Sequence, residues 1–245
     1  MPSWLVHLQG APSDLGALAE ALGPGDPEVV VEGEDYYLKC NWSESRTNAR
    51  EGFDYAKSFL PLLAKVMELA TGRAPDLNTT TRIVEVGEDG TRQSLYHVSQ
   101  TFTIPMEGLE AGPDGAVKAT VSGAPLPVTT GAIRPWIREA QQNPVVEQVL
   151  LWHGERDWRK LYNALDAIQG DLGGWREISE KGWATKAQIN HFKHTANSLK
   201  AIGKDARHGR QFEPPKKPMS MPEALDLVRH VVAKWLDSKS QKSPP

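Results

Sequence analysis

Only one cysteine, Cys40, occurs in the 245 residues, and no long apolar segment is present. A single cysteine excludes an intramolecular disulfide and is typical of proteins in a reducing compartment. No run approaches the ~18 apolar residues that a membrane-spanning helix needs. The first ten residues, MPSWLVHLQG, lack the basic segment and the apolar core of a secretory signal. We therefore expect a cytoplasmic protein that does not enter a membrane.

Neither sign of charge is in large excess, because 28 lysines and arginines face 31 aspartates and glutamates, for a net charge of −3. This balance argues against a globally basic nucleic-acid-binding protein, although it leaves room for a local basic patch. Hydrophobic residues at 39% and charged residues at 24% are ordinary for a globular chain.

Several signatures of well-known enzymes are missing from the sequence. It contains no Gly-x-x-x-x-Gly-Lys phosphate loop, no Gly-x-Gly-x-x-Gly dinucleotide motif and no Gly-x-Ser-x-Gly nucleophile turn. The lack of a second cysteine excludes a zinc site built on several thiolates. Cys40 stands beside Lys39 on a predicted strand, and we interpret it as a structural residue. We expect no cofactor.

The first half of the chain, residues 1–121, predicts a mixed α+β domain. Apolar runs and period-two alternation between turn residues indicate strands, and apolar spacings of three and four indicate helices. The expected strands are residues 4–8, 28–32, 36–40, 82–86, 93–104 and 116–121. One helix is expected to start with Ser13 or Asp14 as its cap, and a second to cover residues 49–70. This order is that of an α+β protein rather than of strict βαβ alternation.

The most regular helical pattern in this half contains a proline. Apolar residues recur at intervals of three and four from Ala49 to Ala70, which predicts one buried face along about six turns. Pro61 lies in the middle, cannot donate a hydrogen bond to the carbonyl of residue 57, and crowds that carbonyl with its ring. We therefore expect a kink or a break at Pro61, and we interpret the apolar face as core rather than as a binding groove.

Residues 122–131, SGAPLPVTTG, are rich in Pro, Gly and Thr and carry little to bury, so they are the predicted linker. After them, residues 132–238 predict an all-helical domain. Its helix starts are marked by Asn143–Pro144, by Asp157, and by the capping boxes Thr185–Gln188 and Ser220–Glu223. Six of the eight tryptophans lie in this half, which predicts helices packed around large aromatic side chains.

Ionisable groups of mixed chemistry gather between Thr185 and Gly209, toward the end of a predicted helix. Arg207 and His208 are candidate catalytic residues, because an arginine binds phosphate and a histidine can protonate a leaving oxygen in metal-independent RNA cleavage. The candidate binding residues around them are His194, Asn197, Asp205 and Arg210. The alternative interpretation is structural: Asp205 and Arg207 tie the helix end to the next segment.

His191 and His194 are three residues apart, a spacing that suits two metal ligands on one helix face, with His208 as a third ligand. A zinc site also needs an acidic or cysteine partner, and the His-Glu-x-x-His order is missing. We therefore expect no metal. The imidazoles are expected to face solvent or to form hydrogen bonds with neighbouring segments.

One motif carries a resemblance to other proteins. It consists of Ala196-Asn197, Gly203 and Asp205-Ala206-Arg207-His208-Gly209, followed by Pro218-Met219 and Glu223-Ala224. This run resembles a motif of uncharacterised bacterial proteins over roughly residues 145–236. The helical half also resembles HEPN domains, the helical bundles of bacterial toxin and defence ribonucleases. Their signature is an arginine, a polar residue and a histidine several positions later, whereas Arg207 and His208 are adjacent here.

These patterns favour a non-catalytic binding or assembly module of a bacterial system, and the resemblance makes antiviral defence one expected setting. A protein partner or self-association is expected. The alternative is a HEPN-like ribonuclease or toxin component that acts on RNA, with Arg207 and His208 as catalytic residues. A third interpretation, a small-molecule sensor that uses the α+β half, is supported only by the order of elements.

Overall fold

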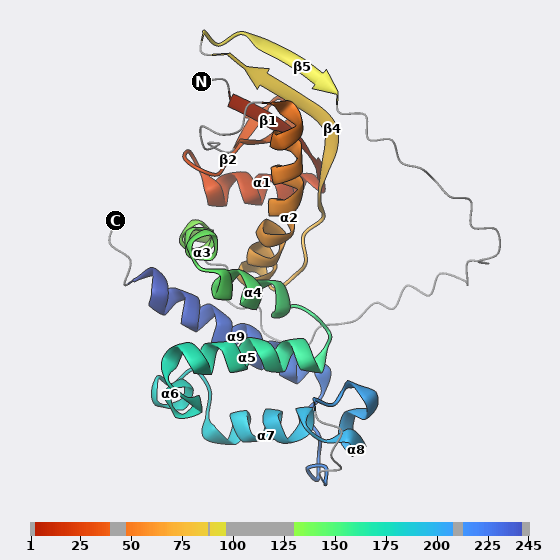
Figure 1. The fold of residues 1–245 in the computed structure, drawn as a ribbon, viewed down its shortest axis with the longest axis vertical. Helices are drawn as coiled ribbons and strands as arrows, with labels where there is room; N and C mark the ends of the chain where they lie inside the picture. Colours follow the sequence, from red (N-terminus) through yellow and green to blue (C-terminus); the bar gives the residue numbers. More distant parts are fainter. Residues whose placement is uncertain (1–2, 40–47, 88, 97–129, 208–212, 242–245) are drawn as a thin grey trace, which may run out of the picture.

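The computed structural model describes residues 3–39, 48–87, 89–96, 130–207 and 213–241. It confirms the α+β class: an antiparallel sheet with two helices comes first, and helices follow (Figure 1). The strands are β1 (Ser3–Gly10), β2 (Glu28–Glu32), β3 (Asp35–Lys39), β4 (Leu77–Val86) and β5 (Arg92–Tyr96). They form one sheet in the order β2-β3-β1-β4-β5. The predicted strand at residues 116–121, and the predicted continuation of β5 to residue 104, lie outside the described residues.

The two faces of the sheet are buried in different ways. Helices α1 (Pro12–Leu22) and α2 (Ala49–Thr71) cover one face, where Val6, Leu38 and Ile83 are buried. The second face carries a small separate cluster of Leu5, Tyr37 and Val84. An ion pair between Arg92 on β5 and Glu32 on β2 joins the two edge strands, so the sheet curls over this second face.

Helix α1 starts differently from the prediction. It begins at Pro12, and Ala11 is its N-cap, without a side-chain capping bond, so the expected cap at Ser13 or Asp14 is wrong. The Asp14 carboxylate is instead buried and accepts hydrogen bonds from the Arg73 guanidinium and from the backbone N–H of Asp76. The bond from Arg73 holds the pKa of Asp14 below its usual value, against the opposing effect of burial.

Helix α2 runs without a break through Pro61, so the break that the sequence allowed does not occur. Asn48 caps its start by accepting a hydrogen bond from the backbone N–H of Glu51, and Gly72 ends it in the left-handed region at φ 77°. Leu60, directly before the proline, and Leu62, directly after it, are both buried. Packing on both sides of Pro61 therefore offsets the hydrogen bond that the proline cannot make.

The second half is helical, as predicted. The helices are α3 (Thr130–Gln142), α4 (Pro144–Trp152), α5 (Trp158–Leu172), α6 (Trp175–Glu180), α7 (Lys186–Ala196), α8 (Leu199–Ile202), the 3₁₀ turn η1 (Gly203–Asp205) and α9 (Met221–Ser240). The predicted caps at Asn143 and Asp157 are confirmed, because both side chains accept hydrogen bonds from backbone N–H groups of the first turn. Both capping boxes are confirmed as well. No helix in the described parts of the chain is long and apolar enough to cross a membrane.

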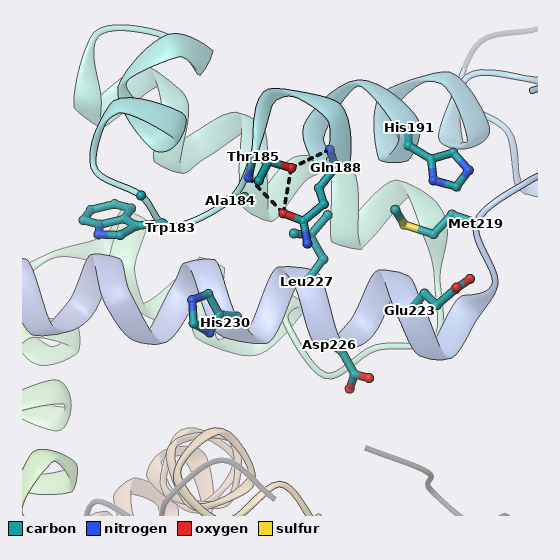
Figure 2. A pocket seen from close by; sticks show the side chains of 11 residues that line it. Trp183, Ala184, Thr185, Gln188, His191, Met219, Glu223, Asp226, Leu227 and His230 are labelled. Carbon is teal, nitrogen blue, oxygen red and sulfur yellow. Dashed lines mark hydrogen bonds between the residues drawn. The ribbon is translucent and has the colours of Figure 1, made fainter. Parts of the chain in front are cut away.

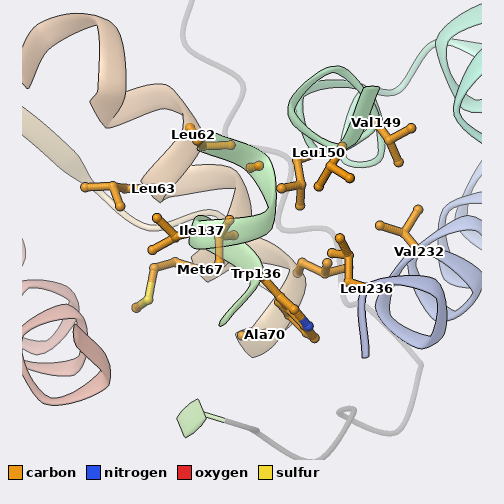
Figure 3. Close-up of a cluster of buried hydrophobic side chains, with 14 of the residues drawn as sticks. Leu62, Leu63, Met67, Ala70, Trp136, Ile137, Val149, Leu150, Val232 and Leu236 are labelled. Carbon is orange, nitrogen blue, oxygen red and sulfur yellow. The ribbon is translucent and has the colours of Figure 1, made fainter. Parts of the chain in front are cut away.

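The two halves share one hydrophobic core. Its buried side chains form a single cluster from β1 to α9, and α2 packs against α3, α4 and α9. Figure 3 shows the junction, where side chains of these four helices meet. The guanidinium of Arg134 on α3 also donates hydrogen bonds to the backbone carbonyls of Gly23 and Pro27. The predicted linker lies almost wholly outside the described residues, so the boundary at 122–131 stays a prediction.

A buried carboxylate lies beside this core. Glu68 on α2 is 5% exposed and pairs with Lys65 at 3.0 Å and with Arg229 of α9 at 2.6 Å. Burial raises the pKa of Glu68, but the hydrogen bond and charge of Lys65 and the charge of Arg229 outweigh it and hold the pKa below its usual value. Gly154 fits against the same carboxylate, since a Cβ there would lie 2.5 Å from Glu68 Oε1. His153 is fully buried next to this group.

Replacing Trp235 with alanine is expected to destabilise the fold strongly. Its ring is fully buried on α9, and its indole N–H donates to Asp171 at 2.8 Å, so truncation should cost about 3–5 kcal/mol. Thermal melting monitored by circular dichroism measures the effect, and Lys234→Ala, an exposed change one residue away, is the control. A Trp235→Ala melt no lower than that of the control would mean that α9 is not docked through this ring.

Stability is also expected to fall as the pH drops from ~6.5 toward 4. Burial lowers the pKa of His153 to about 4, whereas an unfolded histidine titrates near ~6.5. Between these pH values the unfolded chain binds one more proton than the folded chain. Acidification therefore lowers the free energy of unfolding by up to about 3 kcal/mol. His153 Nδ1 lies 2.6 Å from the Leu150 carbonyl oxygen, and in the His153→Asn variant the side-chain amide can donate this bond instead. The free energy of unfolding of the variant should therefore change less with pH. Chemical unfolding at several pH values measures this dependence, with His230→Asn as the control. An equal dependence on pH in wild type and His153→Asn would contradict the prediction.

Candidate functional site

Arg207 is held against helix α5. Its guanidinium lies 4.1 Å from the centre of the Tyr162 ring and 3.8 Å from the Asp166 carboxylate, and its backbone N–H donates to the carbonyl of Ala196 at 3.0 Å. These contacts fasten the segment after η1 to α5 and to the end of α7. The structural interpretation, in which Asp205 and Arg207 tie the helix end to the next segment, stays a prediction.

The two histidines of α7 are also engaged. His194 Nε2 lies 2.6 Å from the carbonyl of Glu213, and His191 Nε2 lies 2.7 Å from the carbonyl of Lys217. Only a protonated ring nitrogen can bond to a carbonyl, so each imidazole donates from Nε2. The pair therefore ties residues 213–217 along α7. Among the described residues, no group of three or more His, Cys, Asp or Glu side chains could hold a metal ion.

The other predicted site residues are only partly brought together. Asn197 donates its amide to the carbonyl of Lys193 at 2.8 Å, and its buried Oδ1 has no hydrogen-bond partner within the described chain. Asp205 is exposed in η1, and within the described chain it forms no ion pair with Arg207. His208 and Arg210 lie outside the described residues. The structure thus places Asn197 and Arg207 at the same end of α7.

An aromatic cluster under this end was missed by the sequence analysis. The Tyr162 ring contacts Trp175 at 5.9 Å and Phe192 at 6.1 Å between centroids, and the ammonium of Lys193 lies 4.3 Å from the Trp175 ring centre. Two cations thus cover rings of this cluster: Lys193 lies over Trp175, and Arg207 lies over Tyr162. Residues more than 40 positions apart meet here, and no local spacing in the sequence signals such a contact.

A groove of about 610 Å³ lies between α7 and α9 (Figure 2). Its lining includes the apolar side chains of Trp183, Ala184, Met219 and Leu227. Its polar lining residues are Thr185, Gln188, His191, Glu223, Asp226 and His230. The two capping boxes lie at this groove, because Thr185 and Gln188 start α7 while Glu223 belongs to the box that starts α9.

A second polar group lies on the curled side of the sheet. His7 is bonded through Nδ1 to the Thr80 hydroxyl at 3.0 Å and lies 3.4 Å from Asp35 through Nε2. Asp35 also accepts from Arg82 at 2.9 Å and from the Tyr37 hydroxyl at 3.2 Å. Both imidazole nitrogens face partners, so this group joins β1, β3 and β4.

Charge is distributed unevenly along the chain. Residues 185–217 contain eight lysines and arginines and two acidic residues, whereas the rest contains 20 and 29. The exposed lysines of this segment are Lys186, Lys200, Lys204, Lys216 and Lys217. The described residues of this segment, 185–207 and 213–217, form the end of the molecule farthest from the sheet (Figure 1), which we call the basic end. A charge count in windows along the sequence would have found it.

Arg207→Ala is expected to lower the free energy of unfolding by about 1 kcal/mol, because the variant loses the contact with the Tyr162 ring. In a double-mutant cycle with Tyr162→Leu, measured by chemical unfolding, the coupling should be about 0.5–1 kcal/mol. Lys200→Ala, on the same end of the molecule, serves as the control and should show no coupling to Tyr162. Additive effects of Arg207→Ala and Tyr162→Leu would show that the arginine is not a structural tie.

Beside these tied side chains, two features of the helical half stay open to a partner: the groove between α7 and α9 and the exposed lysines. Both lie in the helical half, within residues 182–230. No protein-family model, curated protein or solved structure matches this chain.

Proposed function

We propose that the chain is a non-catalytic binding module of a bacterial system, and that its basic end binds the phosphate backbone of RNA without cleaving it. One observation carries this proposal: the arginine and the histidines of α7 are used in internal contacts, while the lysines around them are exposed. Binding and catalysis make different demands, and this surface meets those of binding.

Metal-independent cleavage needs a cation on the phosphate and a histidine free to move a proton. The Arg207 guanidinium lies between Tyr162 and Asp166, and His194 donates to a backbone carbonyl. Neither group is placed to act on a substrate phosphate. The HEPN-like ribonuclease is therefore the second candidate, and the same experiment tests it.

Phosphate binding needs only mobile cations in a field of one sign. The exposed lysines supply them: Lys186 is the first residue of α7, and Lys204 lies in η1, past the other end of that helix. Outside residues 185–217 the acidic residues outnumber the basic ones by nine, so a polyanion is repelled elsewhere and steered to the basic end. Single strands suit cations that are spread over several elements, because their flexible backbone can follow them.

The test is fluorescence anisotropy with a labelled single-stranded oligouridylate at low and moderate salt. Lys186→Glu combined with Lys204→Glu should weaken binding at least tenfold. Each lost phosphate contact removes about 0.7 from the slope of log K against log salt, so two contacts should reduce it by about 1.4. Both side chains are exposed, so the melting temperature should stay unchanged.

Arg50→Glu combined with Lys57→Glu on α2 changes the net charge equally and is the matched control. Equal weakening by both double variants, or equal binding of polyglutamate, would contradict specific RNA binding at the basic end. Cleavage of the oligouridylate by wild type, lost in His208→Ala at an unchanged melting temperature, would establish the ribonuclease instead.

A further inference from the structure

The groove between α7 and α9 has two rims of opposite charge. On one rim His191, which lines the groove, bonds to the backbone carbonyl of Lys217, so the backbone that carries the exposed Lys216 and Lys217 runs beside the groove. On the other rim Glu223 and Asp226 project from the first turns of α9, and both are exposed. The charge of Lys217 helps to lower the pKa of Glu223, after the larger effect of its hydrogen bonds with Ser220, which places the two rims within electrostatic reach.

Such a pair of rims is self-complementary. A two-fold axis across the groove sets the lysines of one copy against the carboxylates of the other, and the same contact recurs on the other side of the axis. An isologous interface needs this arrangement, whereas a rim of a single sign would repel its own copy. Asp226 is well suited to this role, since it is exposed and forms no ion pair with any described residue.

We infer that two copies of this chain pair across the groove between α7 and α9, with Lys216 and Lys217 of each copy against Glu223 and Asp226 of the other. The floor contributes little apolar area, because Met219 and Leu227 are each only 8% exposed. Charge therefore supplies most of the attraction, and the dimer weakens as salt rises. It is a weak pairing of the kind that small polar interfaces form.

Charge exchange tests the pairing directly. Sedimentation velocity of the full chain without RNA, over about 5–200 µM and at low salt, should show a monomer–dimer equilibrium for wild type. Lys217→Glu alone and Asp226→Lys alone should each be monomeric, because each creates two repulsive contacts in its own dimer. An equimolar mixture of these two variants should form the dimer again, since both contacts between positions 217 and 226 are attractive in the mixed pair. Neither change touches the Ser220–Glu223 capping box.

The control is Asp54→Lys, an exposed change of the same kind on α2, and this variant should dimerise as wild type does. A wild type that stays monomeric over this range would overturn the inference. So would single variants that dimerise like wild type, or a mixture that stays monomeric. The RNA test alters Lys186 and Lys204 instead, so the outcome of either experiment leaves the other interpretable.

Discussion

The Glu68 carboxylate lies almost fully buried on α2, and an ionised group in such a place is stable only with cations and hydrogen bonds around it. Lys65 comes from the same helix, but Arg229 comes from α9, 161 positions further along the chain. Loss of Arg229 would leave the buried charge with Lys65 alone, and loss of both cations would leave it unpaired, at a cost of about 3–5 kcal/mol. The sheet half and the last helix are therefore fixed to one another by a requirement that neither half can meet alone.

Helix α9 transmits this constraint to the binding surface. The same helix carries Arg229 at the junction and Asp226 at the groove, one turn apart. Its first turn is held in register by the Ser220–Glu223 box, and its later turns by Trp235. The start of α9, which lines the groove, is consequently fixed to the core through the same helix.

Local chemistry made a large part of this fold predictable. Strand positions followed from alternation, and four helix starts followed from caps whose hydrogen bonds close within three residues. The failures concern competition with distant groups. Asp14 was expected to cap α1, yet Arg73 takes its carboxylate. The contact of Arg207 with Tyr162, 45 positions earlier, has no local signal in the sequence either.

The curl of the sheet has a consequence for how the molecule behaves in a crowded solution. Edge strands expose unpaired backbone groups that can template pairing with another chain. The edge strand β2 has the sequence Glu-Val-Val-Val-Glu, and its Val31 is half exposed, so it has the composition of such a template. The Arg92–Glu32 clasp draws β2 and β5 toward each other across the second face, and a bent edge is a poor template for a straight strand. We therefore expect this surface ion pair to hinder amyloid-like association at the edge strands. Its small contribution to folding stability would not reveal this role.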